Sequence, residues 1–442
     1  MPARASIRAL AAERGLELSA LLTAVIGLVA SAIAARTVDA GGRGALAVLV
    51  TWATVLAWTA TGSVDKAVIA RADVRSRPVV PPAVGLTVLG LLGVASVPLA
   101  LGVGAVVVDG PWLVVMFAAV TCGNVAVDMR AADLVARRRW SGLVRMRLLQ
   151  PLLYLGGCLA AAATTAIWPA YGISLFVAAV GVSVWLPPLL VGGWRRIRPV
   201  WPTRGQSRRL VGFAGGYHLG AVLHLVNLRI DLLLLPSAFA LPQVGVYAVA
   251  TAAGNIVGVL GSAGLLRGLT GRAPGNRVID GTGLGLSSLL AAVVAGSAPW
   301  SVPLAFGSGF VAAVPAAQLL CLAGVLVAVR HGVNGRLAGQ HRPWATAAVN
   351  GCALLVFLAV FPFCRTVTEV ASATVLASAV SLALAGWLVT MKPHAAQEVI
   401  REVQPCESAS TPQPSCPSAP PGSSPSPTGS SAGSPLAPTR SR

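Results

Sequence analysis

The feature that most constrains this chain is a series of about twelve apolar stretches, each long enough to cross a lipid bilayer. A helix needs roughly 20 mostly apolar residues for this, and Leu16–Ala35, Gly44–Gly62 and Trp344–Phe363 meet the requirement. Only helices and closed barrels satisfy their backbone polar groups within lipid, and these stretches lack the alternation of barrel strands. The sequence therefore predicts an all-α polytopic membrane protein.

The order of these stretches predicts two six-helix bundles around a central cavity, because a long basic gap divides them into two sets of six. The expected spans are residues 16–35, 44–62, 82–105, 111–128, 149–168, 170–191, 211–235, 243–266, 281–304, 311–330, 344–363 and 368–391. The expected parts are a cytoplasmic N-terminus (1–15), an N-terminal lobe (16–191), a basic cytoplasmic linker (192–210), a C-terminal lobe (211–391) and a disordered cytoplasmic tail rich in Pro, Ser and Gly (392–442).

The net charge of +19 lies in alternate gaps between the spans. Arginines cluster before the first span and in every second gap, and we assign Arg330 and Arg336 to the gap after the tenth span. The remaining gaps hold only Arg36, Arg43 and Arg365. The positive-inside rule then predicts that both termini lie in the cytoplasm. The excess of arginine over lysine, with abundant Ala, Gly and Val, suggests a bacterial protein, and we expect it in the cytoplasmic membrane. Charges spread over separate short loops argue against a nucleic-acid partner.

Sequence motifs give catalysis little support. The seven cysteines form no Cys-x-x-Cys pair, and the chain lacks a P-loop, Gly-x-Ser-x-Gly and His-Glu-x-x-His. We therefore expect no enzyme, no catalytic residues, no metal site and no cofactor.

Three segments, in order along the chain, resemble polysaccharide flippases of the multidrug/oligosaccharidyl-lipid/polysaccharide exporter superfamily. They are "AARTVDAGGRGALAVL" (Ala34–Leu49), "LVNLRIDLLLLPSAFALPQVGVYAVA" (Leu225–Ala250) and "VPAAQLLCLAGVLVAVRHGVNGRLAGQHRPW" (Val314–Trp344). Val38, Asp39 and Ala40 stand where the family has Leu-Gly-Pro. The first span carries no charge beyond Glu17, unlike the arginine-bearing first helix of the lipid II flippase branch.

The resemblance implies a flippase that moves polyprenyl-diphosphate-linked oligosaccharides across the membrane by alternating access, for cell-surface polysaccharide biosynthesis. Its partners would be this lipid substrate, the membrane and other polysaccharide-assembly proteins. Two alternatives stay open. One is a cation- or proton-coupled multidrug exporter of the same superfamily, and the other is a membrane scaffold of a polysaccharide assembly complex that transports nothing.

The seventh span holds the densest set of polar residues. His224, Asn227 and Asp231 share one helical face by their spacing, whereas His218 and Arg229 lie on another. Two polar faces suggest that this helix contacts both a cavity and a neighbouring helix. Ionisable residues within a span are default functional candidates because their insertion into lipid is costly.

The functional hypothesis is that Arg229 holds the diphosphate, since a guanidinium binds phosphate bidentately without losing its charge. Asp231 would then tune Arg229 or couple an ion, and His224 and Asn227 would complete the binding set. The alternative is an interhelical hydrogen-bond cluster that fixes this helix.

Outside the seventh span, Arg36 and Arg43 are candidates for receiving the substrate at the exit side. Alternatively they form a turn-stabilising cluster with Asp39. Two further pairs are candidates for gating or coupling. They are Asp65 with Lys66 and Asp128 with Arg130. Three amides in small-residue helices suggest packing, with cavity lining as the alternative: Asn124, Asn255 and Asn334.

Overall fold

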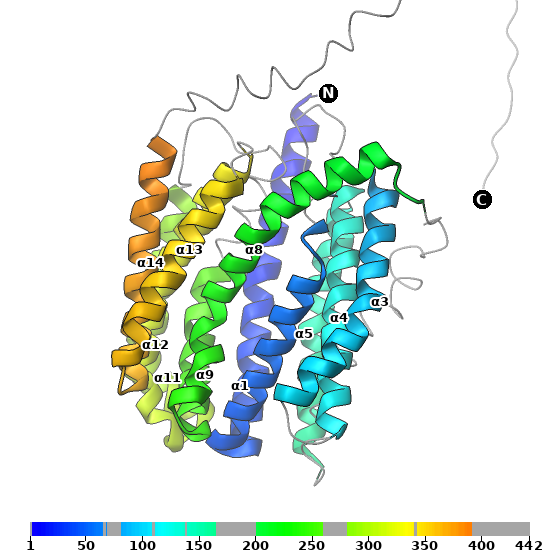
Figure 1. Ribbon diagram of the computed structural model, residues 1–442. Coiled ribbons are helices and arrows are strands. Elements are labelled where there is room, and N and C mark those ends of the chain that lie inside the picture. Colours follow the sequence, from blue (N-terminus) through cyan, green and yellow to red (C-terminus); the bar gives the residue numbers. More distant parts are fainter. Residues whose placement is uncertain are drawn as a thin grey trace, which may run out of the picture. The chain divides into compact units, whose positions relative to one another are not determined.

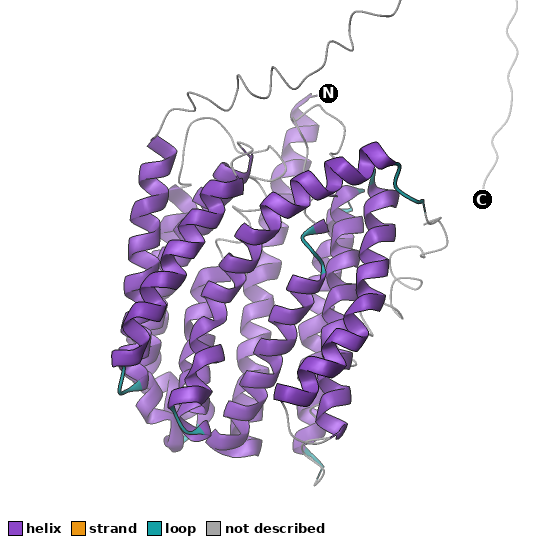
Figure 2. Cartoon of the chain, viewed as in Figure 1, coloured by secondary structure: helices purple, strands orange, loops and turns teal. Residues whose placement is uncertain are grey.

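The computed structural model is helical throughout the parts of the chain that it describes, apart from short connecting turns (Figures 1 and 2). These parts are residues 2–64, 68, 81–107, 111–137, 139–164, 200–259, 281–339 and 343–390. Eight stretches within them are long and apolar enough to cross a membrane. The expected all-α polytopic fold is therefore confirmed. The sixth expected span (170–191) and the expected tail (392–442) lie outside the described residues.

The N-terminal helices begin with two spans that one turn joins. Asp39 has a φ of 59° and interrupts α1, so this element is two helices rather than one. The Asp39 Oδ1 accepts a hydrogen bond of 2.7 Å from the backbone N–H of Gly42, which stabilises the turn. The set comprises α1 (Pro2–Ala60), α3 (Pro82–Val107), α4 (Pro111–Ala136) and α5 (Trp140–Ala162).

The C-terminal helices start at recognisable capping residues. Thr203 and Gln206 form a capping box before α8, and the Glu369 carboxylate accepts from backbone N–H groups at the start of α14. Helix α8 thus begins inside the stretch expected to be a linker (192–210). The set comprises α8 (Arg204–Ala238), α9 (Leu241–Gly258), α11 (Gly281–Phe306), α12 (Val314–Gly339), α13 (Pro343–Val360) and α14 (Val367–Thr390), with 3₁₀ turns η4 (Ser308–Ala313) and η5 (Phe361–Phe363).

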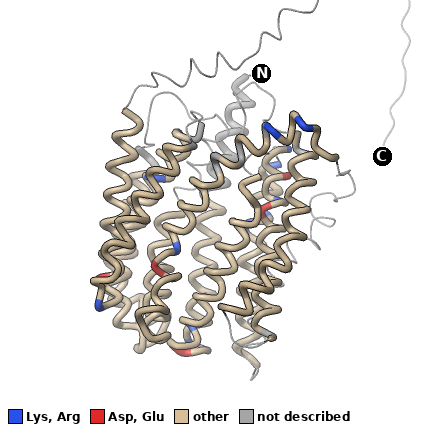
Figure 3. Tube along the Cα trace, in the orientation of Figure 1, with Lys and Arg blue, Asp and Glu red and all other residues tan. Residues whose placement is uncertain are grey.

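The bundle of residues 18–390 has two chemically different ends, and Figure 3 shows charged residues concentrated toward them with few between. We call the end with the starts of α5 and α8 the basic end, because Arg137, Arg145, Arg204 and Arg208 lie there. The opposite end carries the turn at Asp39 and the α8–α9 connection, and we call it the turn end.

The two helix sets meet most closely at the turn end, where α1 packs against α9. Ala35 and Ala47 of α1 belong to the same buried cluster as residues of α8, α9, α11, α12 and α14. A side chain on Gly44 would collide with the backbone of Leu241, and one on Gly245 would collide with the backbone of Ala40. Glycine therefore permits a backbone-to-backbone contact here.

Toward the basic end, α8 connects the two sets (Figure 1). Its early residue Leu210 packs in a buried cluster with Val84 of α3 and Leu143 of α5. Further along α8, the His218 ring lies 3.2 Å from the Ser63 hydroxyl, which follows α1. Helix α8 therefore begins against the N-terminal helices and ends within the core of the C-terminal ones.

Candidate functional site

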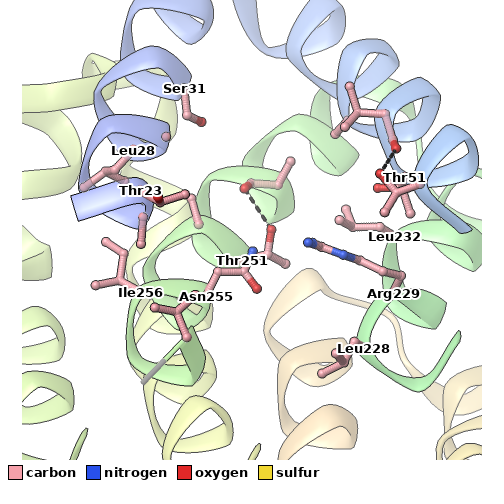
Figure 4. Close-up of a pocket in the computed structure, with 18 of the residues that line it drawn as sticks. Thr23, Leu28, Ser31, Thr51, Leu228, Arg229, Leu232, Thr251, Asn255 and Ile256 are labelled. Atoms are coloured by element: carbon pink, nitrogen blue, oxygen red, sulfur yellow. Dashed lines mark hydrogen bonds between the residues drawn. The ribbon is translucent and has the colours of Figure 1, made fainter. Parts of the chain in front are cut away.

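A cavity of about 660 Å³ lies between the two helix sets. Helices α1, α4 and α5 line one side, and α8, α9 and α12 line the other. Figure 4 shows lining residues of α1, α8 and α9 around the cavity. Along α9 its lining residues run from Ala248 to Val259, on the basic-end side of the Gly245 contact. The cavity therefore occupies the half of the interface that the α1–α9 contact leaves open.

Two arginines reach this cavity from opposite helix sets. Arg229 projects from α8 toward Thr251 of α9, and its guanidinium forms no hydrogen bond or ion pair within the described residues (Figure 4). Arg43 lines the cavity from α1, and its Nη2 donates a hydrogen bond of 2.7 Å to the Ser31 hydroxyl. The sequence left open whether Arg229 faces a cavity or a neighbouring helix, and the structure places it in the cavity lining.

The charge of the cavity wall is one-sided. His331 of α12 joins the two arginines in the lining, and no Asp or Glu occurs among the described residues that line the cavity. Arginines in a wall that carries no carboxylate of its own produce a positive potential there, which attracts anions and repels cations. This wall is therefore suited to an anionic ligand.

The uncharged part of the wall is rich in hydroxyl and amide groups. Asn124 of α4 and Asn255 of α9 both line the cavity. Of the two roles considered for these amides, packing and cavity lining, the structure shows cavity lining. Amides and hydroxyls can each donate and accept hydrogen bonds, as a polyhydroxylated ligand requires. The other polar lining residues are Thr23, Ser31, Thr51, Thr54, Gln150, Tyr154 and Thr251.

Asp231 is buried behind the cavity wall rather than exposed on it. Its Oδ2 accepts a hydrogen bond of 2.7 Å from the Tyr247 hydroxyl, and its Oδ1 accepts one of 2.8 Å from the backbone N–H of Leu232. The Tyr247 hydroxyl also lies 3.4 Å from that of Thr374 in α14. Asp231 thus connects α8 with α9 and α14, as the alternative interhelical role requires.

His224 also faces the interior of the C-terminal helices. Its Nδ1 lies 3.1 Å from Oδ1 of Asn350, whose Nδ2 donates to the carbonyls of Thr346 and Gly220. Because this orients the Asn350 oxygen toward the ring, His224 carries its proton on Nδ1. The ring packs edge-on against His331, with centroids 4.7 Å apart.

Asn227 contacts a buried arginine. With its amide turned so that Oδ1 faces Arg330, it accepts hydrogen bonds of 2.5 Å from Nη1 and 3.1 Å from Nη2. Nη1 of Arg330 also donates a hydrogen bond of 3.1 Å to the Ser381 hydroxyl of α14. Each of His224, Asn227 and Asp231 thus contacts a neighbouring helix of the C-terminal set. Their spacing predicted a shared face and left open whether it binds substrate or packs against other helices.

The assignment of Arg330 to a basic loop after the tenth span is wrong. Helix α12 continues to Gly339, and the Arg330 side chain is 1% exposed. Polar groups on α8 and α14 replace the water that would otherwise solvate the guanidinium. Sequence reasoning missed this residue because a basic residue near the end of an apolar stretch is usually counted as a loop charge.

Arg36 lies at the turn end, away from the cavity lining. Its Nε donates a hydrogen bond of 2.8 Å to the carbonyl of Ala305, and its Nη2 donates to that of Leu304. These are among the last carbonyls of α11, which lack partners within that helix. Arg36 therefore joins α1 to the C-terminal helix set instead of forming the expected cluster with Asp39 and Arg43.

The remaining candidates lie nearer the basic end. Arg130 forms a 2.9 Å ion pair with Asp133, which also pairs with Arg137 at 2.5 Å. Asp128, the expected partner of Arg130, interacts electrostatically with Arg147 of α5. The candidate pair Asp65 and Lys66 lies outside the described residues. Among the residues described, no three His, Cys, Asp or Glu side chains gather to hold a metal.

The fold is that of the MOP superfamily transporters. A lipid II flippase, MurJ, in an inward closed conformation is 10% identical, with a TM-score of 0.60 over 86% of this chain and 88% of that one. A MATE transporter in complex with MaD5 is 12% identical, with a TM-score of 0.56 over 86% and 94%. An inward-facing multidrug resistance MATE transporter of the MOP superfamily is 12% identical, with a TM-score of 0.55 over 88% and 96%.

No family model matches the chain, and no curated protein matches it by sequence. The structural likeness therefore defines a class, the multi-pass membrane proteins with this two-bundle fold. The ligand and the activity have to be inferred from the chemistry of the cavity.

Proposed function

We propose that this protein is a flippase that moves a polyprenyl-diphosphate-linked saccharide across the bacterial cytoplasmic membrane by alternating access. The observation that carries the proposal is the cavity wall, where Arg43, Arg229 and His331 occur without any Asp or Glu among the described lining residues. Such a wall offsets the cost of dehydrating a diphosphate, whereas a cationic drug would meet only repulsion.

The size and polarity of the cavity support the same substrate class. Its volume of about 660 Å³ falls in the range of sites for small organic ligands. The amides and hydroxyls of α4, α5 and α9 suit the hydroxyl groups of a sugar, and the prenyl chain would remain in lipid. Of the solved relatives in fold, one is itself a lipid II flippase.

The α1–α9 contact supports alternating access. Backbone contact at Gly44 and Gly245 closes the turn end, while the cavity lies toward the basic end. With the basic end in the cytoplasm, as the positive-inside rule predicts, this state would receive its substrate from the cytoplasm. Separation of α1 from α9 would then release it outside.

A reconstituted system tests the proposal. Purified protein in liposomes is given a fluorescent polyprenyl-diphosphate saccharide, and its movement between leaflets is followed by quenching from one side. Wild type should accelerate the movement. Arg229→Ala should slow the movement about 10- to 100-fold, since a charge-assisted hydrogen bond contributes about 1.5–3 kcal/mol. Arg229→Lys keeps the positive charge and should slow the movement less.

The matched control is Arg365→Ala, which removes an exposed arginine near the start of α14 and should leave the rate unchanged. A wild type that leaves the diphosphate lipid in place but exports ethidium would overturn the proposal in favour of a multidrug exporter. A protein that moves neither would favour a scaffold. Deletion in the native host should accumulate the lipid-linked saccharide on the cytoplasmic face and remove one surface glycan.

A further inference from the structure

The buried polar cluster around Arg330 has features that the proposed transport cycle does not use. Arg330 is 1% exposed, and no carboxylate pairs with it among the described residues. Its contacts to Asn227 and Ser381 are to neutral groups. A buried cation that lacks a counter-charge costs several kcal/mol, so this arrangement calls for an anion.

Unfilled hydrogen-bonding atoms show where an anion would bind. The Nε–H of Arg330 is buried without an acceptor, although Nη1 and Nη2 are engaged. Nδ1 of the adjacent His331 is likewise buried without a partner. A guanidinium Nε–H and an imidazole N–H are both donors to anions. Buried donors of this kind are rare in folded proteins and require an explanation.

The path to this cluster leads through the cavity wall. His331 both lines the cavity and follows Arg330 directly in α12. Asn227 directly precedes Leu228, which lines the cavity from α8. The cluster therefore adjoins the cavity wall on two helices, α8 and α12.

We propose that Arg330 and His331 bind a single-atom inorganic anion, chloride in the cell, between α8, α12 and α14. Nε is the one Arg330 nitrogen that has no hydrogen-bond partner, so the site matches a halide rather than a diphosphate, which needs several donor groups at once. The bound halide would neutralise Arg330 and hold α12 against α8 and α14. This site is separate from Arg229 and from the lipid substrate.

Halide-dependent thermal unfolding of the detergent-purified full chain tests the site. Chloride replaces gluconate at constant ionic strength, and the background variant Arg43→Gln/Arg229→Gln removes the cavity arginines. The melting temperature of this background should rise with chloride, because a ligand that binds only the folded state stabilises it. Adding Arg330→Gln should weaken the halide affinity about 10- to 100-fold, as expected for loss of a charged hydrogen-bond donor.

Equal chloride dependence with and without Arg330→Gln, or no chloride dependence in the background variant, would overturn the proposal. If the variants do not fold, wild-type crystals soaked in bromide give the answer by anomalous scattering. A peak beside Nε of Arg330 supports the site, whereas a peak only in the cavity, or none, overturns it. Neither measurement uses the lipid, so failure of the proposed transport leaves this test unaffected.

Discussion

The interface between the two helix sets has a closed half and an open half, and they are built from different chemistry. At the turn end, glycines bring the backbones of α1 and α9 together and alanines fill the surroundings. In the other half, arginines, amides and hydroxyls line a cavity. Gly245 and the cavity-lining Ala248 are three residues apart on α9, so one helix serves both halves. In the proposed cycle, the contact that opens and recloses is built from glycine and alanine, whereas the proposed binding surface carries the polar groups.

The largest effect is expected from reversing the charge of the open half. In Thr251→Glu, the new carboxylate would lie opposite Arg229, toward which Figure 4 shows Thr251 facing. It would pair with the guanidinium and repel a diphosphate at a cost of several kcal/mol, so we expect the flipping rate in liposomes to fall about 100- to 1,000-fold. Thr251→Gln has nearly the same shape without the charge and should retain most activity. Equal losses in both variants would mean that shape rather than charge matters there.

Adding a side chain at the glycine contact should destabilise the closed half. A Cβ in Gly245→Ala collides with backbone of α1, which cannot move aside as a side chain would. Overpacking costs about 1–3 kcal/mol, which corresponds to a shift of about 5- to 150-fold in the population with the turn end closed. Labelling of a cysteine introduced at the buried Ala35, in a background without native cysteines, measures this opening. Gly296→Ala is the control, because a Cβ added there meets nothing within 4 Å.

A smaller effect is expected behind the closed half, where Tyr247 and Asp231 hold α9 against α8. Tyr247→Phe removes the donor to Oδ2 of Asp231. Leaving a buried acceptor unsatisfied costs about 1–3 kcal/mol, which thermal unfolding in detergent detects. A double-mutant cycle with Asp231→Ala isolates the pair. Additive losses would contradict a direct interaction between the two side chains.

The smallest effect is expected from Arg36, which joins the two sets at the exposed turn end. Arg36→Gln removes donors to the last carbonyls of α11. A hydrogen bond contributes about 0.5–1.5 kcal/mol net, and water can replace this one, so labelling at the Ala35 position should rise only about twofold to tenfold. Arg365→Gln removes an arginine of equal charge near the start of α14 as the control. No difference between the two variants would show that these contacts do not stabilise the closed half.

The spans and the two faces of α8 were predictable because they depend on local periodicity. Apolar length alone defines a membrane helix, and the 3.6-residue repeat separates Arg229 from His224, Asn227 and Asp231. The partners were not predictable. Asn350 and Tyr247 lie more than ten residues from the polar residues that they contact, in stretches that read as ordinary apolar helix.

The sequence by itself determined the all-α membrane class, the turn at Asp39 and the placement of Arg229 on a different helical face from His224, Asn227 and Asp231. Each follows from residues within a few turns of one another. Only the tertiary structure decided that Arg36 binds the end of α11, that Arg330 is buried, and that the cavity wall carries arginines without a described carboxylate. Those properties depend on which helices become neighbours, and packing between distant segments fixes that choice.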